Sequence, residues 1–200
     1  AVFILGQTDY KRLLAYSSVE NMGIMAVGVG LGSAGAFGAL FHAVNHSLAK
    51  AMLFLLSGNI LARYRTKTIA QVKGLLGAAP ATGLLWVAGF LAITGTPPFG
   101  TFTSKLLILK AAFDTGQPWG MWVGVVFLGL LAVIFIGMTT AFLGMAQGEP
   151  EKPIGPGRDR VWQIAPPVVL GLLVLWLGLA VPESLDSVLR EIARTLGGAA

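Results

Sequence analysis

Residues 36–62 read AFGALFHAVNHSLAKAMLFLLSGNILA, an apolar stretch that contains His42, His46 and Lys50. About 20 consecutive apolar residues are enough for a helix to cross the hydrocarbon core of a bilayer. The stretch therefore predicts a transmembrane helix with ionisable side chains inside it. The three side chains drift only about 40° around the helix per step, so they form a polar ladder on one face. An ionisable group inside a span costs about 2.5 to 3.5 kcal/mol on insertion scales, so its presence indicates a function.

The composition of the whole chain agrees with a membrane protein. Of its 200 residues, 55% are apolar and 12% are charged, whereas a soluble domain carries about 25% charged residues. The net charge is +5, and the basic residues lie between apolar runs. This placement is typical of membrane loops and argues against nucleic-acid binding. The sequence contains no cysteine, which excludes disulfides, thiol nucleophiles and cysteine-bound clusters within it.

The rest of the chain predicts an all-α membrane protein with about five full transmembrane helices, an N-terminal stub and a C-terminal interfacial helix. The stub, residues 1–6, is too short to cross a bilayer, so we expect the chain to begin partway through a larger protein. Residues 146–160 are rich in proline, glycine and charge and predict a cytoplasmic linker. Residues 182–200 alternate apolar and charged side chains at helical spacing and predict an amphipathic tail on the membrane surface. The other continuous crossings are predicted at residues 13–31, 119–145 and 161–181, the last being the final transmembrane helix.

Residues 81–115 predict a crossing that is broken near the middle of the membrane. Gly95, Pro97, Pro98 and Gly100 separate two apolar halves that are each too short to span alone. Proline removes a backbone donor, and such a break survives at membrane depth only where it faces protein or water. With one broken crossing the basic loops all fall on one side, which the positive-inside rule makes cytoplasmic. Two separate full crossings are the alternative.

Glu20 is a second ionisable candidate, inside the predicted helix that precedes the ladder. Ser17, Glu20 and Asn21 are spaced to share one face of that helix. Glu20 is therefore expected to be the counter-charge of a lysine or histidine on the next helix, or a proton donor itself. At about 8 Å from Lys50 and an effective dielectric of about 20, the coupling would be about 2 kcal/mol. The alternative places Glu20 near the headgroups, where water solvates it.

Lys105 follows the predicted break and is a third candidate. Thr101 is expected to cap the second half-helix, and Ser104 lies beside the lysine in sequence. A cation in the first turn of a helix meets the positive end of the helix dipole. Broken helices at the bilayer midplane are where transporters place ion sites, so Lys105 is predicted to lie in such a site.

The ladder itself suits proton transfer. Neutral imidazole accepts a proton at one nitrogen and releases one from the other, and a dehydrated lysine can switch between its two protonation states. One alternative is a structural ladder that only hydrogen-bonds to neighbouring helices. Another is a metal site, because His42 and His46 are four residues apart as in zinc proteases, although Ala43 stands where the general-base glutamate would be.

With these residues identified, the chain resembles the second half of an antiporter-like membrane subunit of respiratory complex I and of membrane-bound energy-converting hydrogenases. The resemblance rests on residues 7–18, QTDYKRLLAYSS, on the helix of residues 42–54, and on the break at residues 95–100 followed by Lys105. Residues 17–23, SSVENMG, are more similar to the hydrogenase-4 and formate hydrogenlyase branch than to complex I.

The resemblance implies a role for each candidate residue by its position in the motifs. Lys50 would be the central lysine of the second half-channel, and His42 and His46 its bridging relay. Lys105 would be the exit-side group on the broken helix. Lys11 lies in the matching loop-to-helix motif and would belong to the uptake side.

The resemblance also implies the architecture and the partners. The family has about fourteen helices built from two inverted five-helix repeats, and residues 1–145 would be the second repeat. Protons would move as redox chemistry proceeds elsewhere, so this chain would have no active site of its own. Its partners would be the missing N-terminal half, other membrane-arm subunits and a peripheral redox module carrying nickel–iron, iron–sulfur or flavin centres. The expected location is the prokaryotic cytoplasmic membrane, and the alternatives are a large subunit of a multisubunit sodium/proton antiporter and a structural membrane spacer.

Overall fold

The computed structural model describes residues 3–150 and 159–197. Within these ranges it has eight α-helices and one 3-10 turn, η1 (Ile69–Gln71), and its extended backbone pairs only in an isolated bridge between Asp9 and Thr68. The prediction of an all-α fold is therefore confirmed. The helices are α1 (Tyr10–Gly30), α2 (Gly32–Tyr64), α3 (Leu75–Ala78), α4 (Pro80–Thr94), α5 (Gly100–Asp114), α6 (Pro118–Ala146), α7 (Val161–Leu179) and α8 (Glu183–Leu196).

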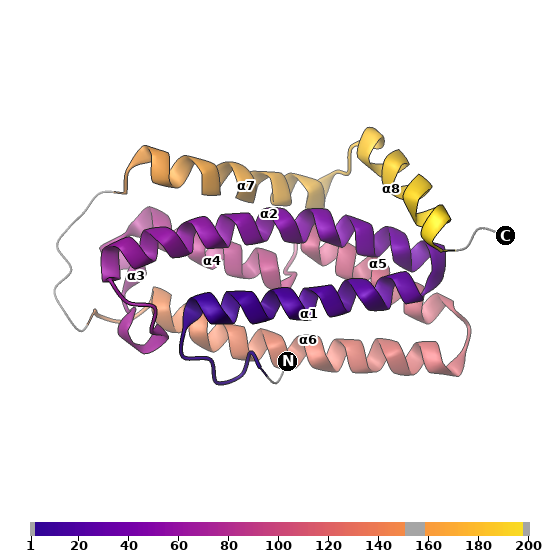
Figure 1. The fold of residues 1–200 in the computed structure, drawn as a ribbon, viewed down its shortest axis with the longest axis horizontal. Helices are drawn as coiled ribbons and strands as arrows, with labels where there is room; N and C mark the ends of the chain where they lie inside the picture. The colour runs from indigo at the N-terminus through magenta and orange to yellow at the C-terminus, as the bar shows by residue number, and fades with distance from the viewer. Residues whose placement is uncertain (1–2, 151–158, 198–200) are drawn as a thin grey trace.

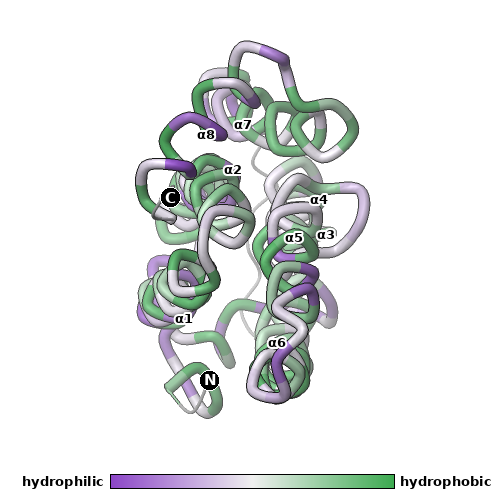
Figure 2. The backbone as a smooth tube through the Cα atoms, turned by 90° about the vertical axis from the view of Figure 1, so that its right-hand side faces the viewer, coloured by the Kyte–Doolittle hydropathy of each residue, from purple (hydrophilic) through white to green (hydrophobic). Residues whose placement is uncertain are grey.

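The central element is α2, which packs against α1, α4, α5, α7 and α8. In Figure 1, α1 runs alongside α2, while α4 and α5 follow one another end to end behind it. Figure 2 shows two layers, with α1 and α2 in one and α4, α5 and α6 in the other. The polar ladder of α2 therefore lies on a helix that is surrounded by other helices of the bundle. Among the described helices, α2, α6 and α7 are long and apolar enough to cross a membrane.

A tight connection joins α1 to α2. Helix α1 begins three residues earlier than predicted because the Asp9 carboxylate accepts hydrogen bonds from the backbone N–H groups of Lys11 and Arg12, at 2.7 and 3.1 Å. A Cβ at Gly35 would lie 2.3 Å from the carbonyl oxygen of Gly28. Only glycine at position 35 permits this approach, which sets α1 directly against the start of α2.

The chain leaves helical geometry between α4 and α5 within the segment that the sequence singled out. Helix α4 ends at Thr94 and is followed by Gly95, whose φ of 81° is readily adopted by glycine. Each of the two helices has 15 residues, a length of about 22 Å. A Cβ at Gly100 would lie 1.9 Å from the side-chain oxygen of Asn45. The first turn of α5 is therefore seated on the polar part of α2.

An aromatic cluster lies near the middle of α4. Trp86 stacks on Phe142 of α6 with ring centroids 4.4 Å apart and meets Tyr10 of α1 edge-on at 6.0 Å. All three side chains are fully buried. This cluster ties α4 to both layers and so fixes the position of the break along α2.

The C-terminal part of the chain contains the connection between α6 and α7 and the helix α8. Helix α6 ends at Ala146 and α7 begins at Val161; residues 151–158 of the predicted linker, 1–2 of the stub and 198–200 of the tail lie outside the described residues. Helix α8 packs on α2 through Leu189 and Ala193, while Val188, Ile192 and Leu196 stay exposed. The short elements η1 and α3 were not predicted.

Candidate functional site

Lys50 points from α2 to α1. Its ammonium donates hydrogen bonds to the carbonyl oxygen of Leu14 and to the Ser17 hydroxyl, the second at 2.6 Å. The residue is 7% exposed, and its Nζ lies 5.8 Å from the centre of the Phe54 ring. The central lysine of the ladder is thus buried and held by two oxygens of the neighbouring helix.

His42 bridges three helices. Its Nδ1 lies 2.8 Å from the Ser104 hydroxyl on α5, and its Nε2 lies 2.8 Å from the Asn21 side-chain oxygen on α1. The Asn21 amide nitrogen donates to the Ser17 carbonyl at 2.6 Å and to the Glu20 carboxylate at 3.0 Å. Because the Asn21 nitrogen faces acceptors, its oxygen must face His42, so Nε2 of His42 carries the proton.

The Ser104 hydroxyl can serve two hydrogen-bond patterns. In one, His42 is neutral and Nδ1 accepts the hydroxyl proton. In the other, His42 is protonated and donates from Nδ1, while Ser104 donates to the Thr101 carbonyl oxygen at 3.0 Å. Rotation of one hydroxyl therefore accommodates both charge states of the imidazole without moving a helix.

Glu20 and Lys105 form a buried ion pair between α1 and α5. The Lys105 Nζ lies 3.8 Å from a Glu20 carboxylate oxygen, and the side chains are 6% and 7% exposed for the lysine and the glutamate. Lys105 also donates to the carbonyl oxygens of Ile93 and Thr94, at 3.4 and 3.3 Å. These belong to the last turn of α4, where the negative end of the helix dipole favours a cation.

Three expectations about this region need correction. Glu20 was expected to be the counter-charge of a lysine or histidine on the next helix, or a proton donor itself; its ion-pair partner is Lys105 of α5, and its side chain is 7% exposed. Lys105 was expected to meet the positive end of its own helix, yet its ammonium reaches the carboxyl end of α4. Thr101 does not cap α5; its hydroxyl donates to the carbonyl oxygen of Ala92 across the break.

His46 and Lys11 stand apart from the network. The His46 ring stacks on the His42 ring with centroids 5.9 Å apart, but in the part of the chain that the structure describes its Nδ1 has no hydrogen-bond partner. Lys11 lies in the first turn of α1, half-exposed, well before Ser17. The structure therefore unites Lys50, His42, Glu20 and Lys105, and it does not join Lys11 to them.

The links between the ionisable groups are small polar residues that sequence reasoning underused. Ser17 and Asn21 were recognised only as sharing a face with Glu20, and Ser104 only as a neighbour of Lys105. Lys50 binds the hydroxyl of Ser17 and Asn21 binds its carbonyl oxygen. The available signal was the four-residue spacing of Ser17 and Asn21 on a largely apolar helix.

A metal site receives no support from this geometry. Both ring nitrogens of His42 are engaged, by Asn21 and by Ser104. Within residues 3–150 and 159–197, no three His, Cys, Asp or Glu side chains are grouped as metal ligands.

A hydrogen-bonded set of buried lysine, histidine and glutamate side chains among long apolar helices is typical of membrane transport proteins. The chain belongs to the family described as NADH:quinone oxidoreductase/Mrp antiporter transmembrane proteins, which matches residues 1–135. It is therefore an integral membrane protein, and the resemblance found in its motifs is confirmed.

Individual relatives agree with this assignment. The chain is 36% identical over 150 residues to a hydrogenase-4 component F homolog of Methylacidiphilum infernorum, covering 74% of this chain and 32% of that protein. It superposes on a chain of the Mrp complex from Dietzia sp. with a TM-score of 0.84 and 26% identity, covering 98% of this chain and 44% of that one. For respiratory complex I from Thermus thermophilus with bound NADH, the TM-score is 0.76 at 27% identity, with 97% and 40% covered. The chain thus spans less than half the length of each relative.

Proposed function

We propose that this chain forms a proton-translocating half-channel within an antiporter-like subunit of a redox-driven membrane complex, of the hydrogenase or complex I type. The observation that carries the proposal is the buried network in which Lys50, Ser17, Asn21, His42 and Ser104 contact one another in turn. Lys50 and His42 are the members that can bind and release a proton, and Ser17, Asn21 and Ser104 hold them in place by hydrogen bonds. A purely structural spacer would not need ionisable groups at these buried positions, given their insertion cost.

Two members of the network can change protonation state. His42 takes up a proton at Nδ1 as the Ser104 hydroxyl turns to Thr101. Lys50 binds or releases a proton at Nζ, which lies beside the Leu14 carbonyl oxygen and the Ser17 hydroxyl. The Glu20–Lys105 pair couples to this line through Asn21, which binds the Glu20 carboxylate.

The Glu20–Lys105 pair supplies electrostatic coupling. At 3.8 Å and an effective dielectric of about 20, the attraction between the two unit charges is about 4 kcal/mol. A proton that neutralises Glu20 removes this attraction and leaves Lys105 without its counter-charge. The protonation of one residue thereby changes the binding of a proton at the other.

Within this proposal, α4 and α5 are one crossing interrupted in mid-membrane. The supporting features are the two lengths of 15 residues, the contact of Gly100 with Asn45, and the reach of Lys105 across the interruption to the carbonyls of α4. With α1, α2, α6 and α7 this makes five crossings. The basic loops then lie on the cytoplasmic side of a prokaryotic membrane, and α8 lies on the opposite surface.

The substitution Lys50→Ala in the native complex tests the proposal. Proton movement into inverted membrane vesicles should stop, because the oxygens of Leu14 and Ser17 lose their only charged donor in the described structure. Electron transfer to an artificial acceptor should continue, since the redox centres are proposed to reside in partner subunits. Undiminished pumping by an assembled Lys50→Ala complex would contradict the proposal.

A second candidate is a large subunit of a multisubunit sodium/proton antiporter. It is favoured by the TM-score of 0.84 with the Mrp complex, compared with 0.76 for complex I. Purification of the assembly separates the two. Nickel, iron–sulfur or flavin centres in the partners would support the redox-driven complex, whereas their absence together with sodium-dependent transport would support the antiporter.

A further inference from the structure

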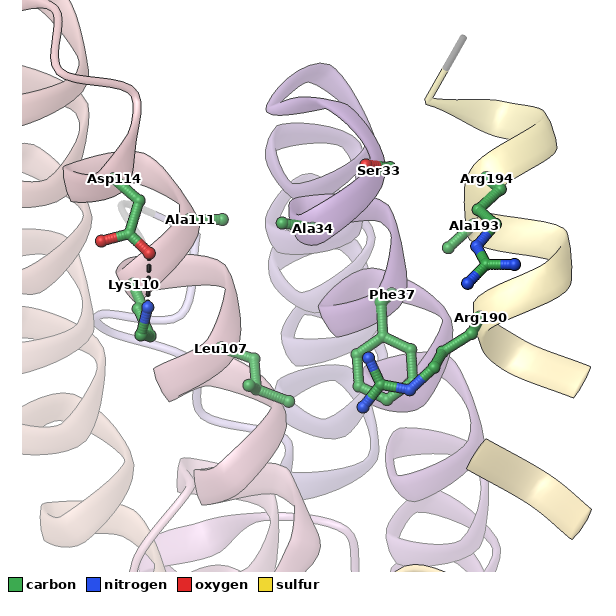
Figure 3. Close-up of a pocket in the computed structure, with 10 residues that line it drawn as sticks. All are labelled: Ser33, Ala34, Phe37, Leu107, Lys110, Ala111, Asp114, Arg190, Ala193 and Arg194. Carbon is green, nitrogen blue, oxygen red and sulfur yellow. Dashed lines mark hydrogen bonds and ion pairs between the residues drawn. The ribbon is translucent and has the colours of Figure 1, made fainter. Parts of the chain in front are cut away.

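A cavity outside the polar network opens between α2, α5 and α8. Its volume is about 410 Å³, and its lining includes Lys110 and Asp114 of α5, Phe37 of α2, and Arg190 and Arg194 of α8. Figure 3 shows the α5 side chains facing those of α8 across the first turns of α2. Three cationic side chains and one carboxylate thus line one cavity.

Arg190 is held so that its terminal nitrogens remain available. Its Nε donates to the Asp186 carboxylate at 2.6 Å, and its guanidinium carbon lies 4.6 Å from the centre of the Phe37 ring. The guanidinium extends across Phe37 on the side that faces α5 (Figure 3). A guanidinium bound at Nε alone keeps four further N–H donors.

The remaining cations also exceed the acceptors nearby. Lys110 donates to Asp114 at 2.5 Å, which occupies one of three ammonium protons. Among residues 3–150 and 159–197, Arg194 has no ion pair or side-chain hydrogen bond. Because guanidinium groups match the geometry of phosphate and carboxylate oxygens, the cavity is suited to an anion.

The position of the cavity identifies the source of that anion. Helix α6 begins at the end of the bundle where α8 lies (Figure 1). Its first turns carry Trp119 and Trp122, which are 52% and 64% exposed, and tryptophan gathers at the membrane–water interface. Helix α8 also exposes Val188, Ile192 and Leu196 on its face away from the cavity, as an interfacial helix does toward acyl chains. The cavity therefore opens at the depth of phospholipid phosphates, beside an interfacial helix.

We propose that this cavity binds the phosphate group of an anionic phospholipid and so fastens α8 to the bundle. Arg194 and the terminal nitrogens of Arg190 donate to the phosphate from α8, and Lys110 donates from α5. The acyl chains extend from the cavity into the surrounding bilayer. The site is independent of the proton network and of the proposed function.

Lipid retention by the purified, partly delipidated complex tests this assignment. The complex is titrated with dioleoylphosphatidylglycerol or dioleoylphosphatidylcholine in detergent, and bound lipid is counted by native mass spectrometry. Arg194→Gln should weaken phosphatidylglycerol binding about tenfold, the effect of losing a charged hydrogen bond. Arg194→Lys should retain most of the binding. Arg12→Gln, at an exposed arginine in the first turn of α1 at the opposite end, is the matched control and should change nothing.

The outcomes divide as follows. Loss of phosphatidylglycerol in Arg194→Gln, with phosphatidylcholine and the Arg12→Gln control unaffected, supports the site. Equal retention by wild type, Arg194→Gln and the double variant Arg190→Gln/Arg194→Gln overturns it. Full displacement of phosphatidylglycerol by millimolar inorganic phosphate would show a free-anion site and would overturn the assignment to lipid.

Discussion

Replacement of Asn21 by leucine should disconnect the network while preserving its shape. Leucine has a similar volume, but it removes the acceptor for His42 and the donors to Glu20 and Ser17, three hydrogen bonds of 2.8, 3.0 and 2.6 Å. Hydrogen bonds between side chains inside membranes contribute about 0.6 kcal/mol each on average. The three together predict a loss of about 2 kcal/mol, which would leave the subunit folded.

Transport is the decisive measurement for Asn21→Leu. Proton uptake by inverted vesicles is followed with a pH-sensitive dye, and electron transfer is recorded in the same vesicles. The number of protons moved per electron should fall to a small fraction of the wild-type value, because His42 loses its link to α1. The thermal unfolding midpoint of the detergent-extracted complex reports the accompanying loss of stability.

Asn59→Leu provides the matched control. Asn59 is on α2, and its amide donates a hydrogen bond to the carbonyl oxygen of Gln163 at 3.0 Å in an exposed position. It lies outside the network, so both transport and unfolding should stay near wild type. A wild-type ratio of protons to electrons in a stable Asn21→Leu complex would refute the assignment of Asn21 as a link.

Two further substitutions test the ion pair and the helix break. Lys105→Gln should lower proton transport and destabilise the subunit, because it leaves the Glu20 carboxylate unpaired. The double variant Lys105→Gln/Glu20→Gln should recover part of the thermal unfolding midpoint. If the losses of stability from the two substitutions simply add, the ion pair does not contribute. Gly100→Ala should lower the free energy of unfolding by about 1 to 3 kcal/mol, because its Cβ would lie 1.9 Å from the Asn45 side-chain oxygen. Gly129→Ala in α6, whose Cβ would meet nothing within 4 Å, should be neutral or slightly stabilising, and equal effects of the two alanines would show that the close contact is absent.

The long helices were predictable because apolar run length is a local property of the sequence. The span predicted at residues 36–62 corresponds to α2 (Gly32–Tyr64), and the interruption after residue 94 falls where α4 ends. The ends were less predictable, because capping by Asp9 and the close approach of Gly35 to Gly28 depend on local geometry. The four residues of α3 are too few to leave a hydropathy signal.

The partners of each ionisable group were harder to predict than the groups themselves. Helical spacing shows which residues share a face, and it correctly places His42 and Lys50 in the interior. It does not show how α1 and α5 are rotated about α2, and that rotation decides that Glu20 meets Lys105. The same rotation directs Lys50 to Leu14 and Ser17 of α1 instead of to His46.

The ammonium of Lys105 contacts two neighbouring helices. Lys105 belongs to α5, but its ammonium donates to the carbonyl oxygens of Ile93 and Thr94 at the end of α4 and pairs with the Glu20 carboxylate of α1. Loss of the charge at this nitrogen would therefore weaken the contacts of α5 with α4 and with α1 at the same time.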